Sequence, residues 1–479
     1  MTTTRGPALD TGGQRESPPG PRQLSWRSLT LWLPLAAWVL VIAGAVVVGY
    51  AMQRQVKLQA LPLIGDVDPV LSLAMPVALL GGLALAAVLP GWCERLGWRR
   101  MLAVVALVSI GWGVALALVR GHDDIDRGLD GAFEYVAAVP TIQAEGIGPV
   151  AETFTDPEVL RTYPIHVQGH PLGATLLFVG LDEVGLGGSY RAFLVMLVVG
   201  AATGPAVLVA ARAVAGESLA RRAAPFLAVG PAAIWTVSSA DALFAAVGAA
   251  AVATVVVAAC RARPDGVPPA GGPAWSPARV AAVAVAGGAL FGLGVQLSYG
   301  LAVLVAVPGV VALWYRQWRV LAWAAVGGLA VLAVVGVAGY WWFDGLDATR
   351  ERYFAGVASD RPYWFFSLLG NPAAFAVAAG PAAVIGLARL RDARLGLLVG
   401  GGWLAVLIAN FSGMSKGEIE RIWLPFVPWV LLAAAAVAPS THHRRPPTAM
   451  PWRIPTASHL LALPVVVAVA VESVVYTPW

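Results

Sequence analysis

The chain has 479 residues, of which 58% are hydrophobic and only 12% are charged. A soluble protein of this length needs about twice that share of charged residues, so the composition excludes a soluble multidomain protein. The mean hydropathy of +0.73 and the long apolar runs instead predict an all-α polytopic membrane protein. The net charge of +5 comes without a basic face interleaved with aromatic residues, so nucleic acid is not an expected partner.

The N-terminal 28 residues are rich in Thr, Gly, Pro and Arg, and we expect residues 1–28 to form a disordered cytoplasmic tail. The apolar run that follows has spanning length and no small-residue cleavage pattern, which favours a retained membrane helix over a signal peptide. Two transmembrane helices are expected within residues 29–101. The two cysteines, Cys93 and Cys260, indicate neither a disulfide framework nor a metal motif.

About 13 transmembrane helices are predicted from apolar stretches of spanning length, several of them short. These stretches cover residues 31–50, 69–90, 102–119, 191–211, 223–239, 241–260, 280–298, 301–315, 320–342, 371–388, 396–411, 422–438 and 456–475.

The charges predict the orientation of these helices. With a cytoplasmic N-terminus, the alternation of spans places 21 of the 32 basic residues inside, together with six of the 27 acidic ones. The resulting balance of +15 inside and −10 outside agrees with the positive-inside rule. We therefore expect a multi-pass protein of the cell (plasma) membrane whose chemistry lies on the outer face.

The inner loops are short except for residues 261–279, which are rich in Pro and Gly and indicate a cytoplasmic linker. No glycine-rich phosphate loop and no dinucleotide fingerprint occur in the sequence. An ATP-driven transporter is therefore not expected.

The first long outer loop, residues 120–190, begins with a cluster of carboxylates. Asp123, Asp124, Asp126 and Asp130 follow a membrane helix directly, where charges are costly unless paired or used. We expect a surface helix over residues 130–139 that places Asp130 and Glu134 one turn apart, and such a carboxylate suits a general base. The alternative is a solvated acidic loop that only enforces topology.

His166 and His170 stand four residues apart in the same loop. Pro171 disfavours helix at His170, so a hydrogen-bonded pair is favoured over the helical geometry of a zinc pair. The apolar run that starts at Leu172 is too short to span, and we expect an interfacial or re-entrant helix there.

Two further outer loops combine charge with aromatic or glycine residues. Residues 343–365 carry three arginines, including Arg361, among aromatic side chains, which indicates either an anion site or a solvated mixed-charge loop. Residues 411–421 hold Lys416, Glu418, Glu420 and Arg421 close to two glycines.

Such dense charge in the short 411–421 connection favours function over solubility. Gly413 and Gly417 allow the backbone to approach a ligand. Lys416 and Arg421 are candidates for binding a phosphate, and Glu418 and Glu420 for orienting them or for binding sugar hydroxyls.

The order of these features resembles the GT-C superfamily of membrane glycosyltransferases, which includes protein O-mannosyltransferases and the aminoarabinose transferase of lipid A. In that pattern an outer loop carries an acidic residue followed by an aromatic one, as Asp130 and Tyr135 do here. A His-Pro segment then opens an interfacial helix, as HPLG does at His170. An Arg opens the next span, as Arg191 does in GLGGSYRAF, and a lone Asp precedes a later apolar run, as Asp241 does.

The resemblance covers residues 102–260, which would form a GT-C-like catalytic core followed by C-terminal transmembrane helices over residues 280–479. It departs from the family pattern in three ways: two helices precede the acidic loop, Leu172 replaces the second proline of the His-Pro-Pro segment, and no soluble domain is expected after the last predicted span.

The resemblance implies a glycosyltransferase that moves a sugar from a polyprenyl-phosphate donor to a hydroxyl of a glycan, glycolipid or protein. It implies Asp130 as the general base, with Asp126 and Asp124 as alternatives in register, and Asp241 as a second carboxylate. His170 would contact the lipid phosphate or the acceptor.

Arg361, Lys416 and Arg421 would stabilise the leaving phosphate, so no cofactor is expected, although a divalent metal stays open as an alternative. A secondary transporter or a lipid-linked sugar flippase is the main alternative function, and a non-catalytic assembly partner is a third. The predicted spans hold few ionisable residues and show no internal repeat, which favours chemistry over transport.

Overall fold

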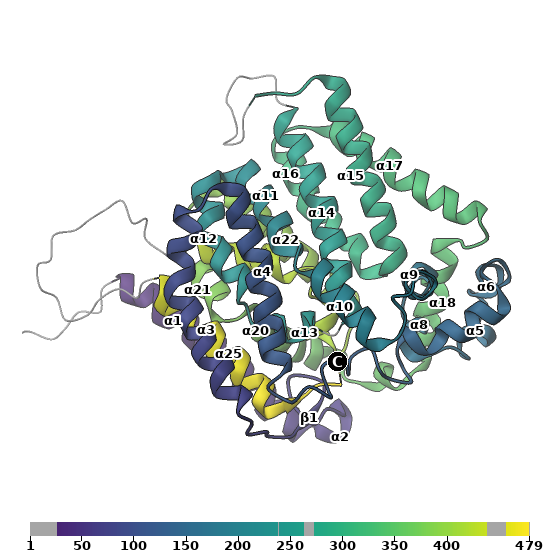
Figure 1. The fold of residues 1–479 in the computed structure, drawn as a ribbon, viewed down its shortest axis with the longest axis horizontal. Coiled ribbons are helices and arrows are strands. Elements are labelled where there is room, and N and C mark those ends of the chain that lie inside the picture. The colour runs from purple at the N-terminus through teal and green to yellow at the C-terminus, as the bar shows by residue number, and fades with distance from the viewer. Residues whose placement is uncertain (1–25, 238, 263–272, 438–456, 479) are drawn as a thin grey trace, which may run out of the picture.

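The computed structural model describes residues 26–237, 239–262, 273–437 and 457–478, and helices dominate these ranges (Figure 1). The only sheet in them pairs two short antiparallel strands, β1 (Asp66–Val67) and β2 (Val475–Tyr476). The predicted all-α membrane protein is therefore confirmed at this level. Residues 1–25 of the expected tail and residues 263–272 of the expected linker lie outside the described residues.

Nine helices of the described ranges are long and apolar enough to cross a membrane. They are α1 (Trp26–Ala51), α3 (Ala74–Arg95), α4 (Trp98–Ala117), the continuous pair α10 (Ser189–Gly200) and α11 (Thr203–Ala215), α14 (Ala240–Arg261), α15 (Pro277–Leu297), α17 (Trp318–Val337), α22 (Ala393–Phe411) and α25 (Ala457–Val474).

The described ranges hold a tenth span if one bent pair of helices, long and apolar enough together to cross a membrane, is counted as a single span. It runs through α19 (Tyr363–Phe365), the π-helical η4 (Phe366–Gly370) and α20 (Asn371–Ala379), and bends by 92° before α21 (Pro381–Arg389). The bend falls at Gly380, whose φ of +75° a residue with a Cβ rarely adopts, and Pro381 follows it.

Three other predicted spans are interrupted or short, because each contains prolines that remove backbone donors. The elements there are α12 (Glu217–Ala228) and α13 (Ala233–Thr236), η2 (Tyr299–Val305) and α16 (Ala306–Trp314), and α23 (Ile419–Ile422), α24 (Val427–Leu431) and η5 (Leu432–Ala436). The described residues thus support nine or ten spans, and the count of thirteen stays a prediction.

The first long loop folds into short helices: η1 (Tyr135–Ala138), α5 (Val139–Glu145), α6 (Ile147–Thr153), α7 (Pro157–Leu160), α8 (Ile165–Gln168) and α9 (Leu172–Glu183). The short helix expected from Leu172 is present as α9. The helix expected over residues 130–139 is wrong in its first half, since Asp130 lies in turns and Glu134 is extended before η1 begins. Gly131 and the lack of apolar periodicity explain the late start.

Small residues set the packing of the spans. The central helix α14 is 78% buried within the molecule, whereas α1 and α17 are only 11% buried and present apolar surface outward. The α15 and α17 pair approaches closely at Gly288 and Gly327, where an added Cβ would come within 1.8 Å and 2.0 Å of the partner helix's carbonyl oxygens. Such contacts are typical of helix pairs in membranes.

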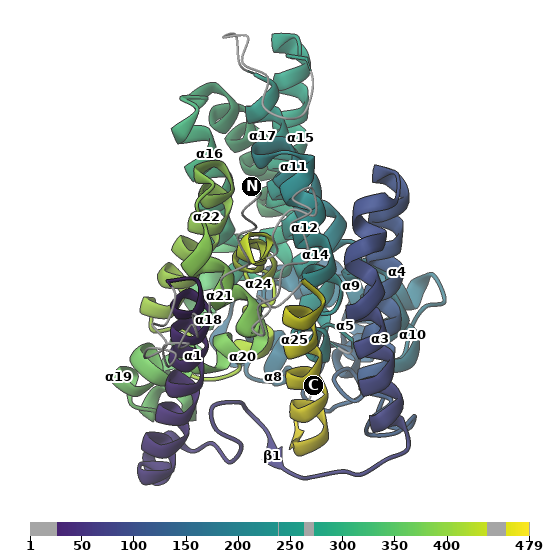
Figure 2. The same ribbon diagram turned by 90° about the vertical axis from the view of Figure 1, so that its left-hand side faces the viewer.

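The short elements gather at one end of the bundle. β1 and α2 (Gln53–Val56) lie at the bottom of Figures 1 and 2, and α15 and α16 extend to the top. The loop helix α18 (Trp342–Ala355) and η3 (Val357–Asp360) connect α17 to α19, and the Thr349 hydroxyl of α18 donates to the Gln168 carbonyl of the first loop. The fold therefore brings two loops distant in sequence into contact.

Candidate functional site

A cavity of about 1520 Å³, which we call the loop cavity, is lined by residues from all three loops predicted to lie outside. Its walls come from residues 132–170, 342–361 and 409–426, with Ser298 and Tyr299 at the start of η2. The sequence analysis identified these loops one by one, and the fold joins them around one space.

Arg421 in α23 is the centre of a buried ion-pair network beside this cavity. Its Nη1 donates to Asp241 Oδ2 at 2.7 Å, and its Nη2 donates to Glu418 Oε2 at 3.0 Å. Asp241, at the start of α14, also accepts from the Ser239 hydroxyl at 3.0 Å. Burial disfavours the charged guanidinium, but the two carboxylates outweigh it and raise the pKa of Arg421 above its ordinary value.

His166 links this network to a further carboxylate. Its Nε2 lies 3.4 Å from Arg421 Nη2, and its Nδ1 lies 2.7 Å from Glu134 Oε1. Because a guanidinium can only donate, Nε2 is the acceptor and Nδ1 carries the proton that faces Glu134. A buried chain therefore runs from Glu134 through His166 and Arg421 to Asp241.

His170 takes a separate position on the cavity wall. Its Nδ1 lies 2.9 Å from the carbonyl oxygen of His166, so it donates there, and its ring packs against Tyr135 and Phe244. Burial lowers the pKa of His170 to about 4, which keeps the ring neutral near pH 7. The favoured hydrogen-bonded pair is thus confirmed, with α8 ending before His170. No group of three or more His, Cys, Asp or Glu residues suited to a metal occurs in the described ranges.

Four other cations line the loop cavity. One of them, Arg161, lies 3.9 Å from Glu351, and the other three donate to uncharged oxygen atoms. Arg361 Nη1 donates to the Lys416 carbonyl at 2.7 Å, and Lys416 Nζ donates to the Ser359 carbonyl at 2.7 Å. Arg352 Nε donates to Gln168 Oε1 at 2.9 Å. Unlike Arg421, these three cations form no ion pair with a carboxylate among the residues that the structure describes.

Two polar atoms beside these cations have unused hydrogen-bonding capacity. Arg361 Nε is buried without a hydrogen-bond partner in the described part of the chain, and the Tyr353 hydroxyl accepts from the Lys416 backbone N–H but has no acceptor for its own proton there. Burial also lowers the pKa of Lys416; the nearby Asp360 acts in the opposite direction, and Arg361 adds to the lowering. An anionic ligand would satisfy such unused donors and cations that are held in no ion pair.

Glu418 sits on this wall in a strained backbone conformation. Its φ of +61° is in the left-handed region, which costs a residue with a Cβ about 1–2 kcal/mol. Its side chain is 35% exposed, and Arg421 and His166 hold the pKa of Glu418 below its usual value although burial acts in the opposite direction. The carboxylate is therefore ionised near neutral pH.

Gly417 explains how this turn closes. Its φ is +106°, and an added Cβ would lie 2.9 Å from Ile64 and 3.0 Å from Arg361 Nη1. Gly413 also has a positive φ, of +76°. Both glycines allow the backbone geometry that brings Lys416 and Glu418 to the cavity, as the sequence indicates.

Glu420 points away from the loop cavity. Its side chain is fully buried, and Oε1 accepts the Ile64 backbone N–H at 2.9 Å. Burial raises the pKa of Glu420 to about 7. Glu420 therefore holds the segment before β1 in place, and it is not among the cavity-lining residues that could touch a sugar.

The three aspartates of the acidic loop are not brought into this network. Asp130 is exposed, Asp124 and Asp126 are half-buried, and none of them lines the loop cavity. Ala132 and Phe133 are the residues of this segment that reach the cavity. The turns over residues 118–134 face Asp130 to solvent, whereas Glu134, four residues later, is buried.

No protein-family model matches the chain, and no curated protein is found to be similar to it. The functional assignment therefore depends on the chemistry of the site.

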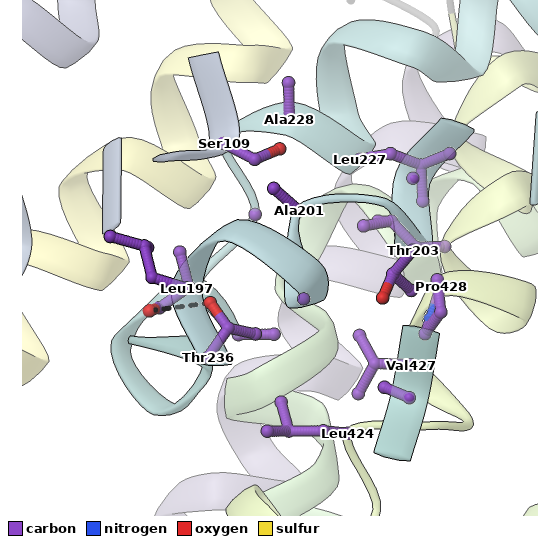
Figure 3. Close-up of a pocket in the computed structure, with 17 residues that line it drawn as sticks. Ser109, Leu197, Ala201, Thr203, Leu227, Ala228, Thr236, Leu424, Val427 and Pro428 are labelled. Carbon is purple, nitrogen blue, oxygen red and sulfur yellow. Dashed lines mark hydrogen bonds between the residues drawn. The ribbon is translucent and has the colours of Figure 1, made fainter. Parts of the chain in front are cut away.

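A second, much smaller cavity, of about 80 Å³, lies among the spans and is shown in Figure 3; we call it the span cavity. It lies between α4, α10, α11, α12 and α24, and Leu197, Ala228 and Val427 are typical of its walls. The hydroxyls of Ser109 and Thr236 donate to carbonyls of their own helical turns. No charged residue lines it.

The sequence analysis missed three residues of the site. Glu134 was considered only as a neighbour of Asp130, and Arg352 and Tyr353 were seen only as members of a mixed loop. The RERYF run at 350–354, in a chain that otherwise avoids charge, is the signal that could have found the last two.

Proposed function

We propose that the chain is a membrane glycosyltransferase that moves a sugar from a polyprenyl-phosphate donor to a hydroxyl acceptor on the outer face of the membrane. One observation carries this proposal: within the described ranges, the loop cavity combines three cations that have no carboxylate partner with the ionised carboxylate of Glu418. Cations of this kind suit the donor phosphate, and the carboxylate suits the proton of the acceptor. The GT-C-like order of motifs supports the same reaction.

The size of the loop cavity supports a reaction of two substrates. A typical pocket for one small ligand measures roughly 300–1,000 Å³. The loop cavity, at about 1520 Å³, has room for a donor sugar with its phosphate and for the acceptor beside it.

In the proposed reaction Glu418 removes the proton of the acceptor hydroxyl. The acceptor oxygen then forms a bond to the anomeric carbon, and the bond from that carbon to the phosphate oxygen breaks. Its electron pair leaves with the polyprenyl phosphate, and the proton stays on Glu418. Direct displacement inverts the anomeric centre. A positioned base of this kind contributes roughly 10²–10⁴-fold.

Arg352, Arg361 and Lys416 would stabilise the phosphate as its negative charge increases. None of the three is held in an ion pair with a carboxylate among the described residues, so little reorganisation is needed when the leaving group forms. Arg421 has a different role, because Asp241 and Glu418 already pair with it. It orients Glu418 within the network.

Three carboxylates are candidates for the role of base. The resemblance favours Asp130, which does not line the loop cavity, whereas Glu418 and Glu145 both line it. Glu418, in the 416–421 turn, is close to Lys416 and Arg361, whereas Glu145 accepts from the Tyr163 hydroxyl at 3.4 Å, so the geometry favours Glu418. We assign the base to Glu418, and Asp241 to the support of Arg421.

The experiment is sugar transfer by the purified protein in proteoliposomes. A ¹⁴C-labelled polyprenyl-phosphate hexose or pentose is supplied with glycolipids and glycans extracted from the native membrane, and both labelled product and released polyprenyl phosphate are measured. We expect Glu418→Gln to lower kcat by about 10²–10³-fold with little change in the donor KM.

The matched control is Arg350→Gln, which removes a charge of α18 that does not line the loop cavity. It should retain transfer. Full activity of Glu418→Gln together with loss of activity in Asp130→Asn would return the role of base to Asp130. Movement of the labelled lipid between leaflets by the wild-type protein without product would instead favour a flippase.

A further inference from the structure

The end of α25 is tied to two segments that lead to the loop cavity. β2 pairs with β1, and the pairing continues where Asp68 N donates to the Val474 carbonyl and Val70 N donates to the Ser473 carbonyl, at 3.0 Å and 2.8 Å. Gly65 permits this approach, since an added Cβ would lie 2.1 Å from the Tyr476 carbonyl oxygen. We call residues 472–477 the α25 clamp.

Two buried arginines connect the same clamp to the start of the acidic loop. Arg127 Nη2 donates to Glu472 Oε1 at 3.0 Å, and Arg127 Nε donates to the Thr477 carbonyl at 3.0 Å. Arg120 Nε lies 3.9 Å from Glu472 Oε1, and its Nη atoms reach Asp68. The Tyr476 ring lies 5.3 Å and 5.4 Å from the two guanidinium carbons.

These contacts are too costly to be incidental. The side chains of Arg120, Arg127 and Glu472 are all at least nine-tenths buried. A buried cation whose carboxylate is removed keeps its desolvation penalty and loses its attraction. The position of the acidic loop therefore depends on Glu472.

We propose that the α25 clamp positions Glu134 and Glu418, the carboxylates of the buried network beside the loop cavity that lie on its two walls, with Arg127 and Glu472 as positioning residues. One route runs from Arg127 along the turns to Glu134 and its contact with His166. The other runs from β1 to Ile64, whose N–H is held by Glu420 two residues after Glu418. The clamp thus fixes both walls that carry the buried network. That these walls are positioned for sugar transfer rests on the proposed function.

The first test measures the position of the wall without any reaction. Ala132, which is exposed and lines the loop cavity, is changed to Cys and given a nitroxide spin label; both native cysteines are buried. In the Glu472→Gln background we expect the room-temperature spectrum of the label to show at least a two-fold shorter rotational correlation time. An unchanged spectrum would overturn the proposal.

The matched control is Glu217→Gln. Glu217 pairs with Arg221 Nε at 2.8 Å and with Arg212 Nη2 at 2.8 Å, so one carboxylate again serves two arginines, in α11 and α12 far from the loop cavity. The label at residue 132 should not change in this background. A change there equal to that in Glu472→Gln would show general loosening and would also overturn the proposal.

The second test measures transfer with a labelled polyprenyl-phosphate hexose. We expect Glu472→Gln to lower kcat about ten-fold with the donor KM within two-fold, and Glu472→Asp, which keeps the charge, to recover at least half of the lost rate. If Glu472→Gln does not accumulate, Tyr476→Leu removes the ring between the arginines while the ion pair remains, and the same two readouts apply.

A variant whose label at residue 132 becomes more mobile but whose kcat equals that of the wild type overturns the positioning role. Absence of transfer by the wild-type protein refutes the proposed function, while the label spectrum still decides whether the clamp holds the wall.

Discussion

The loop cavity and the span cavity belong to one helical bundle but are built from opposite kinds of side chain. The loop cavity is lined by Arg352, Arg361, Lys416 and Glu418, whereas the span cavity of Figure 3 is lined by small and apolar residues with a few hydroxyls satisfied within their own helices. Charges are costly near a bilayer, and their collection around one space indicates selection for a ligand.

The span cavity has a simpler origin. It lies where α10 meets α11 near Gly200 and where Gly230 and Pro231 interrupt the chain after α12. Breaks of this kind leave helices that cannot fill all space between them. The comparison thus separates a cavity that we propose to bind substrates from a gap left by packing, and the predictions below test that separation from the largest expected effect to the smallest.

The double variant Arg361→Gln with Lys416→Gln should have the largest effect. Removing two cations that are held in no ion pair from the proposed phosphate wall should lower transfer by at least about 10³-fold, since one such donor alone is typically worth about 10²–10³-fold. Each side chain donates here to a carbonyl, so the melting temperature should change by only a few degrees. Arg350→Gln serves as the control, and retained transfer in the double variant would remove the phosphate role from this wall.

Asp241→Asn should mainly affect stability. It leaves Arg421 buried with only part of its charge compensated, and breaking a buried pair in this way costs about 3–5 kcal/mol. Denaturant unfolding in detergent measures this loss. Glu217→Gln, in a pair that is one-third exposed on the carboxylate side, should cost about 1 kcal/mol or less. Equal losses in the two variants would contradict the buried network.

Glu420→Gln should change how stability depends on pH. The pKa of Glu420 is raised to about 7 in the folded protein from 4.5, so the folded state binds more protons between these values and stability falls as the pH rises through that window. Glutamine removes this group, so the variant should gain stability relative to the wild type at pH 8. Melting curves at pH 5 and pH 8 measure the difference, which should be smaller or reversed at pH 5.

Ala228→Val should have the smallest effect. It adds two methyl groups beside the span cavity, and such a change in a site with free space typically alters stability by about 1 kcal/mol or less. Transfer should stay within two-fold of the wild type. A loss of transfer comparable with that of Glu418→Gln would mean that the span cavity belongs to the site.

Much of the architecture could be predicted from the sequence, because a bilayer demands long apolar segments and the chain supplies them. Helices α14 and α17 are examples, with their alanine, valine and glycine runs. The helix lengths around Pro225, Pro308 and Pro428 could not be predicted from hydropathy, because a hydropathy average does not register that a proline shortens a helix. The short turn at Gly417 was predictable from composition alone.

The site was predictable only in its parts. Sequence density identified Lys416, Glu418 and Arg421 as candidates, and the structure joins Glu418 and Arg421 to His166 and Asp241 through contacts that cross up to 255 positions. No local sequence pattern predicts which of the Asp130 and Glu134 side chains is buried, because this depends on the residue at which η1 begins. Arg127 is fixed by residues 345 and 350 positions away, which no local pattern indicates.

The left-handed backbone of Glu418 has a consequence for how this chain would respond to selection. Glycine adopts that φ without strain, so Glu418→Gly would relieve about 1 kcal/mol of backbone cost while it removes a carboxylate that the fold can partly spare, because Asp241 still pairs with Arg421. A screen for thermal robustness alone would therefore tend to discard the residue on which the proposed reaction depends.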